Sequence, residues 1–152
     1  MNMKTIRDDR EVHIQFREEI KEKLQNDTFA KWLGIELLEV GPGTAEAQMT
    51  INENMLNAHG TAHGAALFAI ADFVFAVACN SYGKTAVGLS VNIGYLAACQ
   101  NGDKVTARAT EIKRNHRTSW YEVRVENDEE LLAHVSALSY RKNEYFVGTE
   151  DD

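Results

Sequence analysis

The sequence predicts an α+β domain in which a curved antiparallel sheet wraps around one long apolar helix. Three observations lead to this class. Hydrophobic periodicity gives the order helix, two strands, long helix and four strands along the chain. The long helix, within residues 63–81, is apolar on every side, so it must be enclosed and not merely laid on a surface. The chain of 152 residues is long enough for one such core and too short for two.

The first part of the chain predicts an amphipathic helix followed by a hairpin. Between residues 6 and 24, apolar residues recur every three or four positions among mixed Glu and Lys. Residues 35–40 and 44–51 are typical of two strands, and Gly41-Pro42-Gly43 between them favours a tight turn. We therefore expect an N-terminal helix to pack against a sheet.

The second part predicts the long helix and the rest of the sheet. The helix ends at Tyr82-Gly83, where the glycine suits a helix C-cap. Four runs rich in Val, Thr, Ala and aromatic residues then predict an antiparallel meander: residues 85–96, 104–114, 119–126 and 131–141. We divide the chain into an N-terminal amphipathic helix (1–26), the main domain (27–147) and a frayed tail (148–152).

Composition narrows the function classes. Sixteen Lys and Arg against 23 Asp and Glu give a net charge of −7, which argues against a nucleic-acid partner. Cys79 and Cys99 are twenty residues apart, so they form neither a CxxC pair nor a thiolate zinc site, and we expect no metal. The first sixteen residues lack the apolar core of a secretory signal, and the apolar run 65–79 is too short to cross a bilayer. These features predict a cytoplasmic protein without a membrane partner.

Asp72 is the one acidic residue in the long apolar helix. A carboxylate in such a setting costs several kcal/mol unless it is paired, hydrogen-bonded or protonated. It either makes a buried hydrogen bond, points to solvent from an exposed edge, or serves a function.

The loop before the helix offers a second candidate feature. It runs from Asn57 to Gly64 (NAHGTAHG) and places a glycine at the helix start, where unpaired N–H groups can bind an oxyanion. Asp72 lies eight positions after Gly64, which is ~12 Å along a helix axis, whereas a general base acts over ~3 Å. If both residues serve one substrate, Asp72 must meet the Gly64 of a second copy. This predicts an obligate homodimer with two composite sites.

The stretch from Met55 to Gly83 (MLNAHGTAHGAALFAIADFVFAVACNSYG) resembles the hot-dog-fold acyl-CoA thioesterases of the phenylacetic-acid-degradation (PaaI) type, in the superfamily of 4-hydroxybenzoyl-CoA thioesterase. The resemblance implies the hot-dog fold and hydrolysis of an acyl-CoA without a cofactor, CoA being part of the substrate. One departure is Ala65, where the family often has a second glycine. This leaves the preferred acyl group open. The motifs in register are Asn57, His63-Gly64, Leu67-Phe68, Ala71-Asp72 and residues 78–81.

The resemblance also implies roles for individual residues. Gly64 matches the backbone N–H donor that polarises the thioester carbonyl, and Asn57 matches a side chain that holds that carbonyl or the attacking water. Asp72 matches the carboxylate that activates water or attacks directly. His63 matches a histidine that shapes the loop, although it and His59 are also explained as loop residues that bond to nearby backbone.

Substrate contacts are sought in basic and aromatic residues. Residues 113–117 form the dense basic run of the chain, which is either a solvated turn or a contact for the CoA nucleotide through Arg114 or Arg117. We place the acyl pocket between the helix and the partner subunit, lined by Phe68 and Tyr95, with Phe75 assigned rather to the core. Such a lining accepts phenylacetyl-like or medium straight-chain acyl groups.

The predicted function is hydrolysis of an aromatic or medium-chain acyl-CoA by a homodimer or a dimer of dimers. Two alternatives stay open: a sensor that binds acyl-CoA without cutting it, and a hot-dog enoyl-CoA hydratase or dehydratase. A sensor acting on DNA needs a longer and more basic segment than residues 1–26. A hydratase needs an acid/base pair beside the thioester, whereas the histidines here precede the helix glycine.

Overall fold

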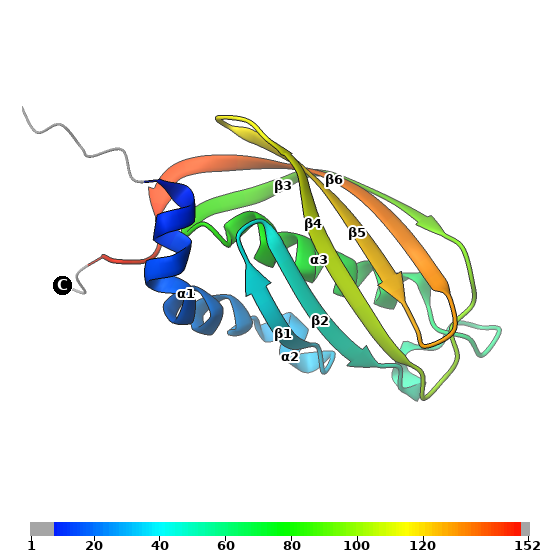
Figure 1. The fold of residues 1–152 in the computed structure, drawn as a ribbon. Coiled ribbons are helices and arrows are strands. Elements are labelled where there is room, and N and C mark those ends of the chain that lie inside the picture. Colours follow the sequence, from blue (N-terminus) through cyan, green and yellow to red (C-terminus); the bar gives the residue numbers. More distant parts are fainter. Residues whose placement is uncertain (1–7, 150–152) are drawn as a thin grey trace, which may run out of the picture.

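The computed structural model describes residues 8–149 and confirms the predicted fold class. A six-stranded antiparallel sheet curves around one long central helix (Figure 1). Every predicted helix and strand is present, and the short helix α2 is an addition that the sequence analysis did not assign. In chain order the elements are α1 (Asp9–Gln25), α2 (Thr28–Trp32), β1 (Glu36–Gly41), β2 (Thr44–Thr50), a 3₁₀ turn (Glu53–Met55), α3 (Gly64–Asn80), β3 (Lys84–Tyr95), β4 (Lys104–Arg114), β5 (Thr118–Glu126) and β6 (Leu131–Tyr145).

The order of strands corrects one expectation. The sheet runs β1-β2-β4-β5-β6-β3, so only β4, β5 and β6 form a meander. β3 pairs antiparallel with β6, for example Ile93 with Val135, and not with β4 as predicted. Alternation along a strand marks which face is buried, but it does not say which neighbour the strand takes. Here α3 connects β2, near one edge of the sheet, to β3 at the opposite edge.

The central helix is enclosed on most sides but not on all. Ten of its residues are buried, including Ile70, Val74 and Phe75. By contrast, Ala65, Asp72 and Ala76 are exposed, and Phe68 and Ala69 are half-buried. These five residues recur every three or four positions, so they form one stripe, which we call the open stripe of α3. The expectation of a fully wrapped helix is therefore wrong on this side.

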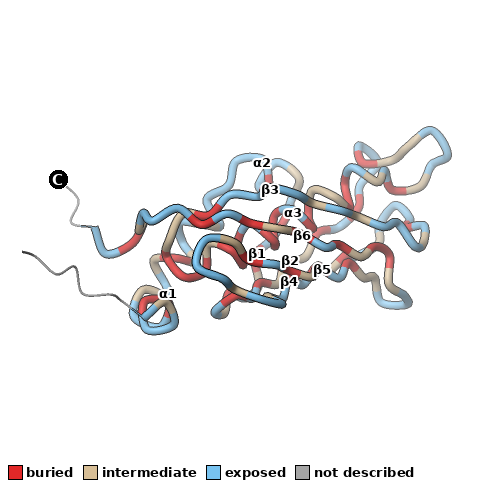
Figure 2. The backbone as a smooth tube through the Cα atoms, turned by 90° about the horizontal axis from the view of Figure 1, so that it is seen from above, coloured by how far each residue is buried: buried red, intermediate tan, exposed pale blue. Residues whose placement is uncertain are grey.

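β3 is an exposed edge strand. Most of its residues are exposed (Figure 2). The apolar Val87 and Leu89 are 40% and 56% exposed. An edge strand presents unpaired N–H and C=O groups on which another strand can pair. The open stripe and the β3 edge are thus two surfaces that one chain leaves uncovered.

α1 covers the end of the domain where α3 stops (Figure 1). Val12 and Ile20 are buried in the common core, and a Cβ on Gly83 would lie 3.1 Å and 3.8 Å from their side chains.

The predicted domain boundary between residues 26 and 27 stays a prediction. Residues 1–7 of the predicted helix and residues 150–152 of the predicted tail lie outside the described residues. No helix within residues 8–149 is long and apolar enough to span a membrane.

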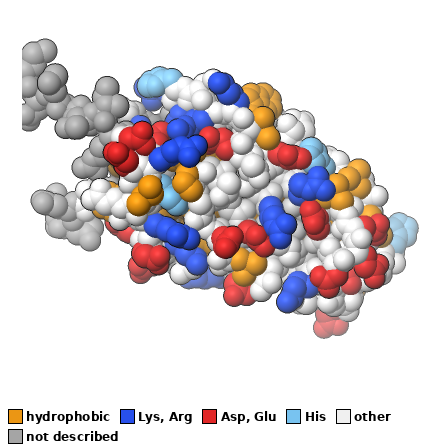
Figure 3. Space-filling view, in the orientation of Figure 1, with side chains coloured by type: hydrophobic (Ala, Val, Ile, Leu, Met, Phe, Trp, Pro, Cys, Tyr) orange, Lys and Arg blue, Asp and Glu red, His pale blue; other side chains and the backbone are white. Residues whose placement is uncertain are grey.

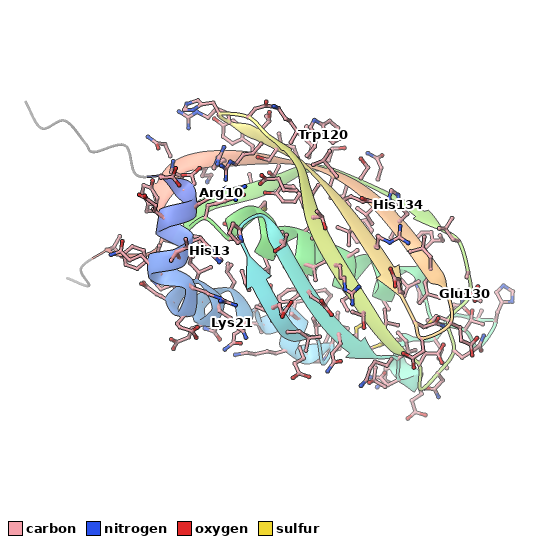
Figure 4. The ribbon with its side chains drawn as sticks, in the orientation of Figure 1. Arg10, His13, Lys21, Trp120, Glu130 and His134 are labelled. Atoms are coloured by element: carbon pink, nitrogen blue, oxygen red, sulfur yellow. The ribbon has the colours of Figure 1, made fainter. Side chains whose placement is uncertain are left out.

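Polar contacts fix α1 in place. The Asp9 carboxylate binds the guanidinium of the buried Arg141 at 2.9 Å and the Lys84 ammonium at 3.4 Å. His13, labelled in Figure 4, donates its Nδ1 hydrogen to the carbonyl of Ser81 over 2.6 Å. Charge pairs and hydrogen bonds from partly or fully buried groups hold their geometry well. The N-terminal helix therefore fixes the end of α3 that lies far from Gly64.

Candidate active site

The loop before α3 is folded by the amide of Asn57. Its Oδ1 accepts hydrogen bonds from the N–H groups of His59 (2.9 Å) and Thr61 (3.3 Å). Its Nδ2 donates to the Thr61 hydroxyl over 3.0 Å. An Asx turn of this kind replaces backbone pairing that a tight loop cannot make. Asn57 thus shapes the loop directly, and its second amide hydrogen has no acceptor within residues 8–149.

His63 caps the start of α3. The ring Nδ1 of His63 accepts a hydrogen bond from the backbone N–H of Ala65 over 3.0 Å. The backbone N–H of His63 donates to the Met55 carbonyl over 2.6 Å. An accepting Nδ1 belongs to a neutral ring that carries its hydrogen on Nε2. His63 therefore satisfies one of the free donors of the helix start.

The N–H of Gly64 is the donor that stays free. No acceptor for it lies within residues 8–149, and it is the first N–H at the positive end of the helix dipole. Tyr95 lies against this position: its hydroxyl donates to the Gly64 carbonyl over 3.2 Å. A Cβ on Gly64 would lie only 3.0 Å from the Tyr95 ring. The missing side chain thus keeps the N–H accessible beside an aromatic ring.

Asp72 lies two turns further along, on the open stripe. It is exposed in the single chain, which agrees with the alternative that it lies at an exposed edge and not with a buried hydrogen bond within one copy. Nearby apolar groups still exclude part of its water, and this desolvation raises the pKa of Asp72. The negative charge of Asp27 raises that pKa further. A carboxylate that holds a proton more readily than usual suits a general base.

Gly64 and Asp72 are kept apart by the helix that carries both. α3 is continuous from Gly64 to Asn80, so the ~12 Å of separation along its axis holds in the structure. No substrate carbonyl can touch both groups of one chain. Cooperation between them requires a second copy.

Two hollows lie beside the open stripe. The first, about 360 Å³, is bordered by Phe29 and Trp32 of α2 and by His63. The second, about 300 Å³, contains Phe68 and Asp72 and is also bordered by Phe29. Sequence analysis missed the part played by α2, although two large aromatic residues in a polar segment were a signal for it.

The remaining aromatic predictions divide between site and core. Phe68 borders the hollow that contains Asp72, and Tyr95 contacts Gly64. Phe75 is 1% exposed and packs edge-on against Tyr121, with ring centroids 5.6 Å apart, so it belongs to the core.

Arg114 and Arg117 lie at the other end of the molecule from Gly64. The Arg114 guanidinium stacks over the Tyr82 ring at 4.1 Å, just beyond the end of α3. Arg117 is exposed at the tip between β4 and β5. On the face shown in Figure 3, Lys and Arg alternate with Asp and Glu. Within one chain the structure does not bring these arginines to the helix start.

The cysteines are packing residues. Burial raises the pKa of Cys79 to about 12 and that of Cys99 to about 11, so both are thiols near neutral pH. Among residues 8–149, no three His, Cys, Asp or Glu side chains are grouped to hold a metal ion.

Comparison with known proteins places this geometry in a family. The model of the Thioesterase superfamily matches residues 59–134. A putative esterase of Archaeoglobus fulgidus is 35% identical over 137 residues, which cover 89% of each chain. Acyl-coenzyme A thioesterase PaaI of Escherichia coli is 38% identical over 106 residues, 70% of this chain and 76% of that protein. The solved structure of the E. coli PaaI protein superposes with a TM-score of 0.81 at 32% identity, covering 91% of this chain and 99% of that one.

Proposed function

Because the chain belongs to the thioesterase superfamily and is a hot-dog thioesterase of the PaaI type, we propose that it hydrolyses aromatic or medium-chain acyl-CoA esters at two sites of a homodimer. In each site, Gly64 of one subunit polarises the thioester carbonyl and Asp72 of the other activates water. The E. coli relative is named an acyl-coenzyme A thioesterase, which supports the CoA ester as substrate.

The two uncovered surfaces support the dimer. Pairing of β3 with the β3 of a second copy would satisfy the free edge and cover Val87 and Leu89. A two-fold axis there sets the two α3 helices antiparallel, so that the Asp72 of each copy can lie opposite the Gly64 of the other. A dimer of dimers stays a prediction.

The chemistry needs only these groups and water. The water oxygen bonds to the thioester carbon while one of its protons passes to the Asp72 carboxylate. The charge that gathers on the carbonyl oxygen is stabilised by the Gly64 N–H of the other subunit, a donor worth about 3 kcal/mol. The C–S bond then breaks, its electron pair leaves on sulfur, and the thiolate takes the proton from Asp72. The products are the free acid and CoA, and Asp72 is ionised again.

Asn57 and His63 serve this site by placing the donor. The Asn57 amide folds the loop, and its remaining hydrogen can reach the carbonyl or the attacking water. His63 occupies the Ala65 N–H and so leaves Gly64 as the free donor at the helix start.

The antiparallel arrangement also gives the two arginines a role. Tyr82 lies ten residues beyond Asp72 along the chain, or about 15 Å if the helical rise continued. The Arg114 and Arg117 of the subunit that supplies Asp72 would therefore lie beyond the other subunit's helix start. From there they can contact the phosphates of CoA.

One observation carries the proposal: an unpaired N–H and a carboxylate lie on one helix that holds them too far apart to act together in a single chain. The test is thiol release from a panel of CoA esters by the wild-type protein and by Asp72→Asn. The proposal expects release that depends on Asp72. Consumption of an enoyl-CoA without thiol release would instead indicate a hydratase, and binding without either reaction would indicate a sensor.

A further inference from the structure

The short helix α2 carries two large apolar side chains that its own packing does not explain. Phe29 and Trp32 are 60% and 79% exposed, and their rings stack with centroids 6.1 Å apart. Exposed apolar side chains that gather beside a concave surface mark sites of binding. Phe29 borders both hollows beside the open stripe, and Trp32 borders the first.

The rings are presented from a fixed base. The Asp27 carboxylate caps α2 by accepting the Ala30 N–H over 2.9 Å. Ala30 is buried, and its carbonyl accepts the N–H of Ile35 over 2.9 Å. Gly34, with φ of +73°, turns the chain between these two contacts. α2 therefore holds Phe29 and Trp32 in place while leaving their faces to the hollow.

The hollows lead to the reacting group. Both are bordered by Phe29, Ala65 and Ala69, and the second reaches Asp72 and Phe68. Asp72 lies seven positions after Ala65 in α3, which is about 10 Å along the axis. An acyl group whose carbonyl carbon lies beside Asp72 can extend along this distance towards the rings.

We propose that these two neighbouring hollows, which share Phe29, Ala65 and Ala69 and which we call the α2 groove, hold the acyl group of the ester cleaved by the Asp72 of the same chain, and that Phe29 and Trp32 select the acyl group by its size. This inference rests on the proposed function. The groove takes the apolar end of the substrate because its walls are mainly apolar, whereas the phosphates of CoA need charged partners. Selection by size follows because Trp32 borders only the hollow away from Asp72, so a short acyl group beside Asp72 ends before it reaches that ring.

The first test is kinetic. In the variant with both Phe29→Ala and Trp32→Ala, kcat/KM should fall at least about tenfold for phenylacetyl-CoA, which can meet Phe29, and for decanoyl-CoA, whose chain is long enough to reach Trp32, because the apolar contacts of the acyl group are lost. For acetyl-CoA it should change by less than about twofold. The control is Trp120→Ala, since Trp120 is 42% exposed on the outer face of the sheet (Figure 4), and it should leave all three esters unaffected. An equal loss on every ester, or no loss, would overturn the proposal.

The second test does not need turnover. Trp32 and Trp120 are the two tryptophans of the chain, so Trp120→Phe leaves Trp32 as the sole indole. Saturation with S-decyl-CoA, a thioether that cannot be hydrolysed and whose chain is long enough to reach Trp32, should shift Trp32 emission to shorter wavelength, and CoA alone should not. A shift without thiol release from any ester would support binding of the acyl group in the α2 groove and contradict the proposed hydrolysis. Thiol release without a shift would contradict binding of the acyl group in the α2 groove and would still agree with the proposed hydrolysis.

Discussion

Tyr95, the last residue of the edge strand β3, donates its hydroxyl to the carbonyl of Gly64 over 3.2 Å. The strand proposed to form the dimer thus contacts the residue proposed to polarise the substrate. Tyr95 is 52% exposed, so its ring is held from one side only. Pairing of β3 with a second copy would fix this ring, and assembly and site formation would then be coupled.

Replacement of Asp72 by Asn should lower kcat by at least ~10²-fold, because the amide keeps the shape of the carboxylate and cannot take a proton from water. The loss should appear in thiol release with every CoA ester, and sedimentation should show an unchanged dimer.

The same variant should not lose stability. The pKa of Asp72 is raised in the folded chain, so the ionised carboxylate opposes folding once the pH exceeds that pKa. Asp72→Asn removes this cost, and its free energy of unfolding at neutral pH should equal or exceed that of the wild type. Near-normal turnover in a stable dimer would exclude Asp72 as the base.

Replacement of Gly64 by Ala should lower kcat/KM about tenfold or more. The new methyl group would lie 3.0 Å from the Tyr95 ring and beside the free N–H, where it obstructs the thioester carbonyl. Alanine suits a helix start as well as glycine does, so the melting temperature should change little. Ser136→Ala is the control, because Ser136 is exposed on β6, away from the helix start and one strand inside the β3 edge. Equal activity of the two variants would argue against carbonyl binding at Gly64.

The acid limb of the pH–rate profile should respond to Asp27. Desolvation and the charge of Asp27 both raise the pKa of Asp72, and a general base works only when ionised. Asp27→Asn removes the like charge, so the pKa of Asp72 falls and the acid limb of kcat moves to lower pH. Asparagine can still cap α2, which keeps the fold. The control is Asp128→Asn, in the distant turn before β6, which should leave the acid limb of kcat where it is. If the acid limb also stays in place in Asp27→Asn, the charge of Asp27 does not raise the pKa of the catalytic base.

Replacement of Arg114 and Arg117 by Ala should raise KM for acyl-CoA several-fold with little change in kcat, because phosphate contacts bind ground state and transition state alike. The corresponding acyl-pantetheine, which lacks the nucleotide, should show an unchanged KM. Arg114 also stacks on Tyr82, so its replacement can disturb packing as well as binding. The single variant Arg117→Ala therefore tests the phosphate contact without changing that stacking. An equal rise of KM for acyl-CoA and acyl-pantetheine would show that the two arginines do not contact the nucleotide.

Local features of the fold were predictable from the sequence. Alternating strands, the Gly41-Pro42-Gly43 turn and the apolar helix each leave a pattern within a few consecutive residues. The motif around Gly64 and Asp72 was also visible, because a glycine at a helix start and a lone carboxylate in an apolar helix are local signals.

Features set by long-range packing were not predictable in the same way. The pairing of β3 with β6 depends on the path of the whole chain, and alternation within β3 is the same beside any neighbour. The open stripe exists because the sheet ends before it closes around α3, so Asp72 is exposed in one chain although its neighbours in sequence are apolar. Phe29 and Trp32 escaped notice because their importance comes from residues of α3 that lie far away in sequence.

The most direct test of the composite site mixes two inactive variants. Asp72→Asn lacks the base, and Gly64→Pro lacks the N–H donor, while proline is tolerated at the first position of a helix and after the extended His63. If each site takes Gly64 from one subunit and Asp72 from the other, a mixed dimer holds one intact site, and random mixing should restore roughly a quarter of wild-type thiol release. If both groups act within one chain, the mixed dimers hold no intact site and the mixture stays as inactive as either variant alone.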